Sequence, residues 1–148
     1  MKLWEKGSRT EKSVLDFTIG KDPCLDLEIA AFDVIASIAH VLMLESVNLI
    51  SAAEKKALVK ELLNIYESIE KGNFIIEEGM EDVHSQIEKT LTVQLGDSGK
   101  KVHTARSRND QILVDLKLFY RSRIVRLAGM TGELITLMIE KSELNKGT

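Results

Sequence analysis

Apolar residues recur at helical spacing along most of this 148-residue chain. The first predicted helix begins at Asp22 and Pro23 and continues to about Val47, because Asp caps a helix start and Pro tolerates its first position. This segment is apolar nearly all round, which is typical of a helix buried in a bundle. Its polar residues are expected to share one narrow stripe: Asp26, Asp33, Ser37 and His40.

Two shorter amphipathic helices follow. Ser51 and Glu54 form a capping box at the start of the first, which stops at Gly72. After a connector at 73–79, a third helix is expected over about 81–95, followed by a polar turn. The inward faces of the two helices are expected to carry Leu58, Leu62, Ile65 and Ile69, and Val83, Ile87, Leu91 and Leu95.

The last predicted helix is the longest, running without a proline over about 108–141, which is about 50 Å at 1.5 Å per residue. Two apolar rows run along it, one of Leu113, Leu116, Tyr120, Ile124, Leu127, Leu134 and Met138, the other of Val114, Leu118, Val125, Ile135 and Ile139. The three shorter helices can cover only part of these rows. We therefore expect either a piece of a longer bundle protein or an association of several copies.

The predicted fold class is all-α, with an irregular arm over residues 1–21 ahead of the helices. With 44% hydrophobic residues, 5% aromatic residues and a single proline, the chain suits a helical domain with a buried core rather than a β-sandwich. The formal net charge of −3 gives no basic field for nucleic acid or an anionic membrane. A lone cysteine, Cys24, and the lack of an apolar leader or bilayer-spanning stretch indicate a soluble cytoplasmic protein.

The densest run of polar residues, HTARSRNDQ, lies where the polar turn meets the long helix. Ser107 followed by Asp110 is a capping pattern, which places Arg108 and Asn109 in the first helical turn. Arginine at this positive helix end is unfavourable unless an anion is bound there. Free backbone N–H groups and the guanidinium groups of Arg106 and Arg108 suit a carboxylate or phosphate, and Asn109 adds a donor and an acceptor.

Two interpretations of these arginines stay open at this point. Arg106 and Arg108 either hold an anionic ligand at the helix start or pair with acidic side chains elsewhere in the fold. Glu81 and Asp82, at the start of the third predicted helix, are candidate partners for such ion pairs. Only the second interpretation would make the polar block purely structural.

A second polar group, EDVHSQIE, places Glu81 one helical turn before His84 and Glu88 one turn after it, on the same face. A carboxylate beside the His84 imidazole would set its tautomer and raise its pKa, whereas the alternative is an ordinary exposed helix start. His40 is expected to be a core histidine that hydrogen-bonds Asp33 or Ser37. No metal site is predicted, because the three histidines lack close spacing and one cysteine offers no thiolate pair.

The blocks HTARSRNDQ and EDVHSQIE resemble those of the argininosuccinate lyases, a family of the fumarase/aspartase superfamily. A Leu-Trp pair near the start and the order EDVH, GK, HTxRSRNDQ, long helix extend the resemblance over essentially the whole chain. Ala105 and Ser85 stand where many relatives have Gly and Thr. Residues 17–22 replace an Asn-x-Ser segment of many relatives, so no residue of that arm is assigned a role.

The resemblance implies an anti-elimination that cleaves argininosuccinate into arginine and fumarate in arginine biosynthesis, without a metal or organic cofactor. It implies an N-terminal helical lyase domain at 1–107, the start of a central helix bundle at 108–148, and a homotetramer. The residues that the family pattern assigns to substrate binding are Arg108, Asn109, Asp82, His84, Arg106 and Ser107. Of these, Arg106 and Ser107 shape the loop, with Ser107 as a cap.

The catalytic His and Ser segments of the family lie beyond this length, so the resemblance assigns no catalytic residue to this segment. The chain is accordingly expected to be a fragment that is inactive alone. Two other functions stay open. One is a different lyase of the superfamily, such as one acting on adenylosuccinate, and the other is a non-catalytic helical protein that keeps the fold for assembly.

Overall fold

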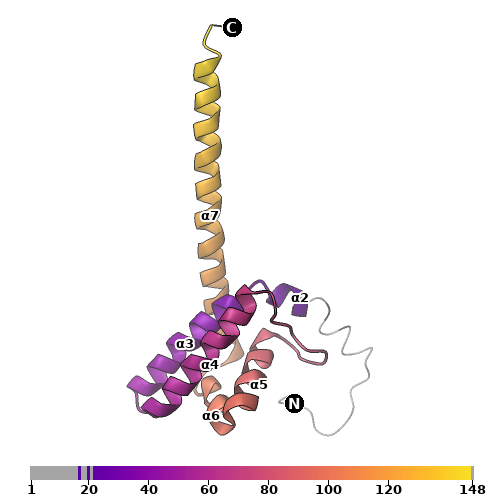
Figure 1. The fold of residues 1–148 in the computed structure, drawn as a ribbon, viewed down its shortest axis with the longest axis vertical. Helices are drawn as coiled ribbons and strands as arrows, with labels where there is room; N and C mark the ends of the chain where they lie inside the picture. The colour runs from indigo at the N-terminus through magenta and orange to yellow at the C-terminus, as the bar shows by residue number, and fades with distance from the viewer. Residues whose placement is uncertain (1–16, 18–19, 21, 148) are drawn as a thin grey trace.

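The computed structural model describes residues 17, 20 and 22–147, and these residues contain helices but no strand. The elements are α2 (Asp22–Asp26), α3 (Ala30–Ser46), α4 (Ala52–Glu70), α5 (Val83–Leu95), α6 (Asp97–Lys100), the 3₁₀-helix η1 (Lys101–His103) and α7 (Arg108–Leu144). The shorter helices gather at one end, and α7 projects from them as a long rod (Figure 1). The all-α prediction is confirmed, whereas the predicted arm lies almost wholly outside the described residues.

The hydrophobic core lies where α3, α4 and α5 meet, and α3 also contacts the first turns of α7. On α3 the buried apolar side chains include Val34, Val41 and Leu44. The predicted inward faces of α4 and α5 are confirmed, with six positions buried and two partly buried: Leu58, Leu62, Ile65, Val83, Ile87 and Leu91, then Ile69 and Leu95. Periodicity alone was sufficient to place this core.

The ends of α4 follow the local signals in the sequence. The Ser51 hydroxyl accepts a hydrogen bond from the Glu54 backbone N–H at 3.2 Å, and the Glu54 carboxylate accepts one from the Ser51 backbone N–H at 2.8 Å. The helix ends at Glu70, and Gly72 follows with a φ of 70°, a left-handed conformation that glycine adopts without strain. The predicted capping box and stop are therefore confirmed.

The prediction of one continuous helix over 22–47 is wrong, because a turn at residues 27–29 interrupts the helix between α2 and α3. The backbone N–H groups of Glu28 and Ile29 bond carbonyls three residues back, at Leu25 and Asp26, so the α-helical ladder stops there. The break lets the Asp26 carboxylate accept a hydrogen bond from the Val83 backbone N–H at 3.1 Å. Asp26 thereby links α2 to the start of α5.

The region around α5 departs slightly from the prediction. The helix begins at Val83, two residues later than expected, because Asp82 is its N-cap and accepts a hydrogen bond from the Ser85 backbone N–H at 2.8 Å. The predicted polar turn after it is instead the short helix α6 followed by η1. Gly99 of α6 is buried, and a Cβ there would lie 2.3 Å from the Leu91 carbonyl oxygen of α5.

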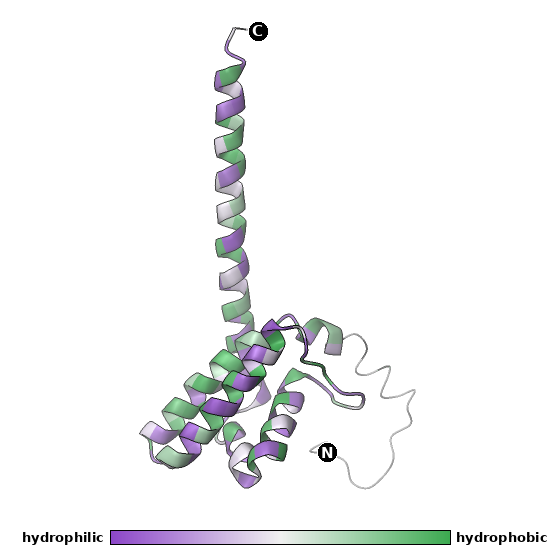
Figure 2. Cartoon of the chain, in the orientation of Figure 1, coloured by the Kyte–Doolittle hydropathy of each residue, from purple (hydrophilic) through white to green (hydrophobic). Residues whose placement is uncertain are grey.

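Helix α7 has 37 residues, and only its first turns pack against the rest of the described chain. Apolar residues recur along its projecting part (Figure 2), where Ile124, Leu127 and Met138 are each 64% exposed. Within residues 22–147 nothing covers the two predicted apolar rows beyond this base. No described helix combines the length and apolar character needed to cross a membrane. The division of the chain at residues 107 and 108 stays a prediction.

Candidate functional site

A cavity of about 250 Å³ opens beside the first turn of α7. Its lining comes from α2, the residues that lead into α5, α5 itself and α7: Asp26, Glu81, Asp82, His84, Arg108, Asn109 and Ile112. Four of the six residues assigned to substrate binding by the family pattern are thus brought together, although they lie on segments more than twenty residues apart in the sequence. The remaining two, Arg106 and Ser107, do not line this cavity.

Ser107 is the N-cap of α7, as predicted. Its hydroxyl accepts a hydrogen bond from the Asp110 backbone N–H at 3.3 Å, while the Asp110 carboxylate accepts one from the Ser107 backbone N–H at 2.8 Å. This capping box fixes the direction in which the helix leaves the loop. It also places Arg108 and Asn109 in the first helical turn, where the positive end of the helix dipole faces the cavity.

The guanidinium of Arg108 has two neighbours on α5 and its cap. It forms an ion pair with the Asp82 carboxylate and donates a hydrogen bond to the Ser85 hydroxyl at 2.6 Å. The interpretation that the arginine pairs with an acidic side chain of the fold is therefore confirmed for Arg108, with Asp82 as its partner. The side chain nevertheless stays 34% exposed and lines the cavity, so its pairing holds it in place at the edge of a concave surface.

Arg106 lies away from the cavity and anchors the loop to α3. Its Nη2 donates a hydrogen bond to the Ser37 hydroxyl at 3.1 Å, and its buried Nε has no hydrogen-bond partner among the described residues. Burial lowers the pKa of Arg106, while the nearby carboxylates of Asp33 and Asp115 oppose this shift. Arg106 therefore supplies positive charge to the buried region behind the cavity rather than to its lining.

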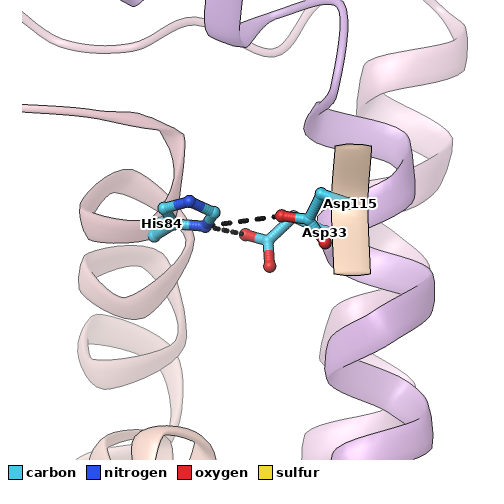
Figure 3. A group of neighbouring side chains, drawn as sticks. All are labelled: Asp33, His84 and Asp115. Atoms are coloured by element: carbon cyan, nitrogen blue, oxygen red, sulfur yellow. Dashed lines mark hydrogen bonds and ion pairs between the residues drawn. The ribbon is translucent and has the colours of Figure 1, made fainter. Parts of the chain in front are cut away.

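Behind the cavity wall lies a buried cluster of three side chains from three helices, shown in Figure 3. The Nδ1 atom of His84 on α5 lies 3.0 Å from the Oδ2 atom of Asp33 on α3 and 3.8 Å from the Oδ2 atom of Asp115 on α7. Both aspartates are fully buried. The Ser37 hydroxyl donates a further hydrogen bond to Asp33 at 3.3 Å, whereas neither oxygen of Asp115 has a hydrogen-bond partner among the described residues.

The electrostatics of this cluster favour a shared proton. Burial alone would lower the pKa of His84, but the hydrogen bond and charge of Asp33, with the charges of Asp115 and Asp26, raise it above the ordinary value. Burial, reinforced by the charge of Asp33, raises the pKa of Asp115 to about 7. The predicted carboxylate beside His84 is thus present, but it comes from α3 and α7 rather than from Glu81 on the same segment.

Asp33, His84 and Asp115 are also residue types that can ligate a metal ion. One ligand atom of each lies within 4.8 Å of the others, which singles out this group in the described part of the chain. The two carboxyl groups lie near the His84 imidazole and the Arg106 guanidinium, and the raised pKa values of His84 and Asp115 favour a proton held between these two groups. The arrangement is therefore a buried network in which a carboxyl group and an imidazole lie close enough to share a proton.

His40 does not pair with Asp33 or Ser37, so that prediction is wrong. Its Nε2 donates a hydrogen bond to the Thr104 carbonyl oxygen at 2.9 Å. Asp33 contacts His84 instead, and Ser37 accepts a hydrogen bond from Arg106. The polar stripe of α3 therefore faces α5 near the start of α3 and the 104–106 loop further along α3. His40 thus helps to hold the loop that leads into α7.

Ala105→Gly should raise the free energy of unfolding by about 1 kcal/mol. Ala105 has a φ of 56°, a left-handed conformation that is unfavourable for an L-residue with a Cβ and neutral for glycine. Urea denaturation followed by circular dichroism would measure the change. Ala57→Gly in the middle of α4 makes the same chemical change at a helical position and should instead lower stability by about 1 kcal/mol.

The free energy of unfolding should fall by about 2 kcal/mol between about pH 5 and 8. A group whose pKa is raised on folding stabilises the protein at low pH and loses this contribution as the pH rises through its folded pKa, which applies to His84 and to Asp115 with its pKa of about 7. Urea denaturation over a series of pH values would measure the slope. Asp115→Asn should flatten it, and an equally steep slope in that variant would contradict the assignment.

Comparison with known sequences places this geometry in a family. The sequence model of the lyase family matches residues 5–148. The chain belongs to the lyase family. It is 51% identical over 145 residues to the argininosuccinate lyase of Phocaeicola vulgatus, which covers 98% of this chain and 32% of that protein. The argininosuccinate lyase of Bacteroides thetaiotaomicron matches over the same shares at 51% identity.

A more distant relative gives the same result. The argininosuccinate lyase of Thermotoga neapolitana is 41% identical over 133 residues, which is 90% of this chain and 33% of that protein. The chain thus spans about a third of the length of the curated relatives that it matches. These matches confirm the resemblance to argininosuccinate lyases that the blocks HTARSRNDQ and EDVHSQIE indicated. The roles of the individual site residues stay predictions.

Proposed function

We propose that this chain builds part of the substrate cleft of an argininosuccinate lyase, which eliminates fumarate from argininosuccinate and leaves arginine. The names of its relatives support this substrate class. The observation that carries the proposal is the placement of Arg108 and Asn109, at the N-terminus of a 37-residue helix, in the wall of a cavity of about 250 Å³. Asp82 and His84 line the same cavity.

The proposed chemistry needs positive donors at a carboxylate. When a proton next to a carboxylate is removed, negative charge develops on that carboxylate, and donors fixed in advance stabilise it most effectively. The free backbone N–H groups of the first turn, the helix dipole and the Arg108 guanidinium supply such donors at one place. Asn109 can donate to and accept from a neighbouring polar group of the substrate. We assign the proton transfers to residues outside this chain.

A hybrid enzyme tests the proposal. The matching 145-residue segment of the Phocaeicola vulgatus argininosuccinate lyase is replaced by this chain, and fumarate release is followed by its ultraviolet absorbance. We expect the hybrid to cleave argininosuccinate and the isolated chain to be inactive. A hybrid that folds and assembles but releases no fumarate would contradict the proposal. Cleavage of adenylosuccinate in preference to argininosuccinate would instead favour the other superfamily lyase.

We further propose that the chain acts in a cytoplasmic homo-oligomer, with a tetramer as the expected form. The exposed apolar rows of α7 support this proposal and also favour the alternative of a non-catalytic assembly protein. Sedimentation of the isolated chain should show dimers or larger species that dissociate on dilution. A strict monomer at high concentration would contradict self-association. An active hybrid would separate the enzyme from the assembly protein.

A further inference from the structure

The wall of the proposed cleft contains a histidine, His84, whose second ring nitrogen is available to a ligand. His84 lines the cavity, and its Nδ1 is directed at the carboxylates of Asp33 and Asp115. In Figure 3 both dashed lines to the carboxylates leave the same ring nitrogen, and the second ring nitrogen, Nε2, takes part in neither contact. Nε2 makes no hydrogen bond to any described residue. It is therefore the ring atom with which His84 can meet a ligand.

The charges that act on His84 come from aspartates on three other helices. Asp33 lies on α3, Asp115 on α7 and Asp26 on α2, and all three charges stabilise a protonated imidazole. Arg106 lies near both buried aspartates and offsets part of their negative charge. Towards the cavity, Arg108 is paired with Asp82, so that pair adds little net charge beside the ring.

The two buried aspartates differ in what else they do. Asp33 accepts hydrogen bonds from His84 and from the Ser37 hydroxyl, so its position is fixed by two partners. Asp115 is fully buried, and neither of its oxygens has a hydrogen-bond partner in the described part of the chain. A buried carboxyl group without such partners is unfavourable for stability. Its nearest cation is the His84 ring at 3.8 Å, which indicates a role connected with that ring.

We propose that Asp33 and Asp115 are positioning residues that hold His84 as an imidazolium with Nδ1 inward, so that its Nε2–H donates to the substrate carboxylate held beside Arg108. The inference rests on the proposed function, because it adds a donor to the same cavity. A neutral ring with Nδ1 donating to Asp33 would present an acceptor at Nε2 and would repel a carboxylate. The hydrogen bond and charge of Asp33, with a smaller contribution from the charge of Asp115, favour the imidazolium form and raise the pKa of His84.

The first experiment measures the protonation of His84 in the wild-type chain. The ¹⁵N chemical shifts of the imidazole nitrogens, recorded by NMR on the ¹⁵N-histidine-labelled chain from about pH 5.5 to 8.5, follow the protonation of each histidine ring. His84→Gln identifies the His84 signals among the three histidines. We expect both His84 ring nitrogens to stay protonated to a higher pH than those of an ordinary histidine. A His84 ring that loses its proton below the ordinary histidine range would overturn the proposal.

The second experiment connects the ring to the ligand. Fumarate affinity of the chain is measured by calorimetry over the same pH range, above the pH at which fumarate is fully ionised. We expect the affinity to fall by about tenfold as His84 loses its proton, because a hydrogen bond to a charged group is lost. Asp115→Asn should move this fall, and the NMR titration of His84, to lower pH. Asp97→Asn removes an exposed carboxylate elsewhere and should move neither.

The outcomes separate this inference from the proposed function. If fumarate binds and the pH dependence follows His84 and moves in Asp115→Asn, the inference is supported. If fumarate binds in a manner that depends on Arg108 but the pH profile is indifferent to His84 and Asp115, the inference is overturned while the proposed function stands. If the isolated chain binds fumarate at no pH, this inference is overturned, whereas the proposed function is decided separately by the activity of the hybrid enzyme.

Discussion

Arg108→Ala should reduce kcat/KM for argininosuccinate in the hybrid lyase by about a hundredfold to a thousandfold. The proposed elimination builds negative charge on a carboxylate, and the Arg108 guanidinium is already held at the cavity edge by Asp82 and Ser85. A donor that is fixed before the reaction needs no reorganisation when the charge develops, so its loss has a large effect. Steady-state kinetics of the purified hybrid, with kcat and KM determined separately, would measure the effect.

Two matched variants sharpen this prediction. Lys56→Ala removes one positive charge from an exposed position on α4 and should leave kcat/KM within about twofold. Arg108→Lys keeps the charge but loses the planar fork that contacts Asp82 and Ser85 together, and it should be intermediate. Wild-type kinetics in Arg108→Ala would contradict the prediction and leave Arg108 only its structural ion pair with Asp82.

Gly99→Ala should lower the free energy of unfolding by about 3 kcal/mol. A Cβ at this position would lie 2.3 Å from the Leu91 carbonyl oxygen and 2.6 Å from the Thr92 backbone nitrogen. Both atoms belong to the backbone of α5, so no side chain can move aside to relieve the contact. Helix α6 would have to shift away from α5, and η1 and the loop that leads into α7 would follow it. Urea denaturation followed by circular dichroism would measure the loss.

The control for this prediction is the same substitution where space is open. Gly129 lies within α7, and a Cβ there would meet nothing within 4 Å. Gly129→Ala should therefore stabilise the helix by up to about 1 kcal/mol, because alanine is the better helix former. A stability of Gly99→Ala within about 0.5 kcal/mol of the wild type would contradict the close approach of α6 to α5.

The elements that could be predicted are those whose signals are local. Ser107 and Asp110 stand three residues apart, and their reciprocal hydrogen bonds define the start of α7 without help from any other helix. The capping box of α4 and the buried positions of α4 and α5 follow from spacing in the same way. The placement of Arg108 and Asn109 in a first helical turn was therefore accessible from the sequence.

What could not be predicted depends on contacts between distant segments. The break between α2 and α3 places Asp26 at the start of α5, a partner 57 residues away. His84 meets Asp33 across 51 residues, and nothing in the spacing of one helix specifies that pairing. Gln111 and Asp115 lie one turn apart on α7 and are its two buried residues within the described chain. Such an inward polar pair indicates a partner on a facing helix.

An NMR titration of the ¹⁵N-labelled chain with fumarate would show directly where an anion binds. Binding at the start of α7 should shift the backbone amide signals of Arg108 and Asn109, and that of Ser85 beside the Arg108 guanidinium. Fumaramide, which has the same shape without charge, should leave these signals in place, and Arg108→Ala should abolish the response to fumarate. Shifts confined to other surfaces, or equal shifts with fumaramide, would contradict an anion site at this helix end.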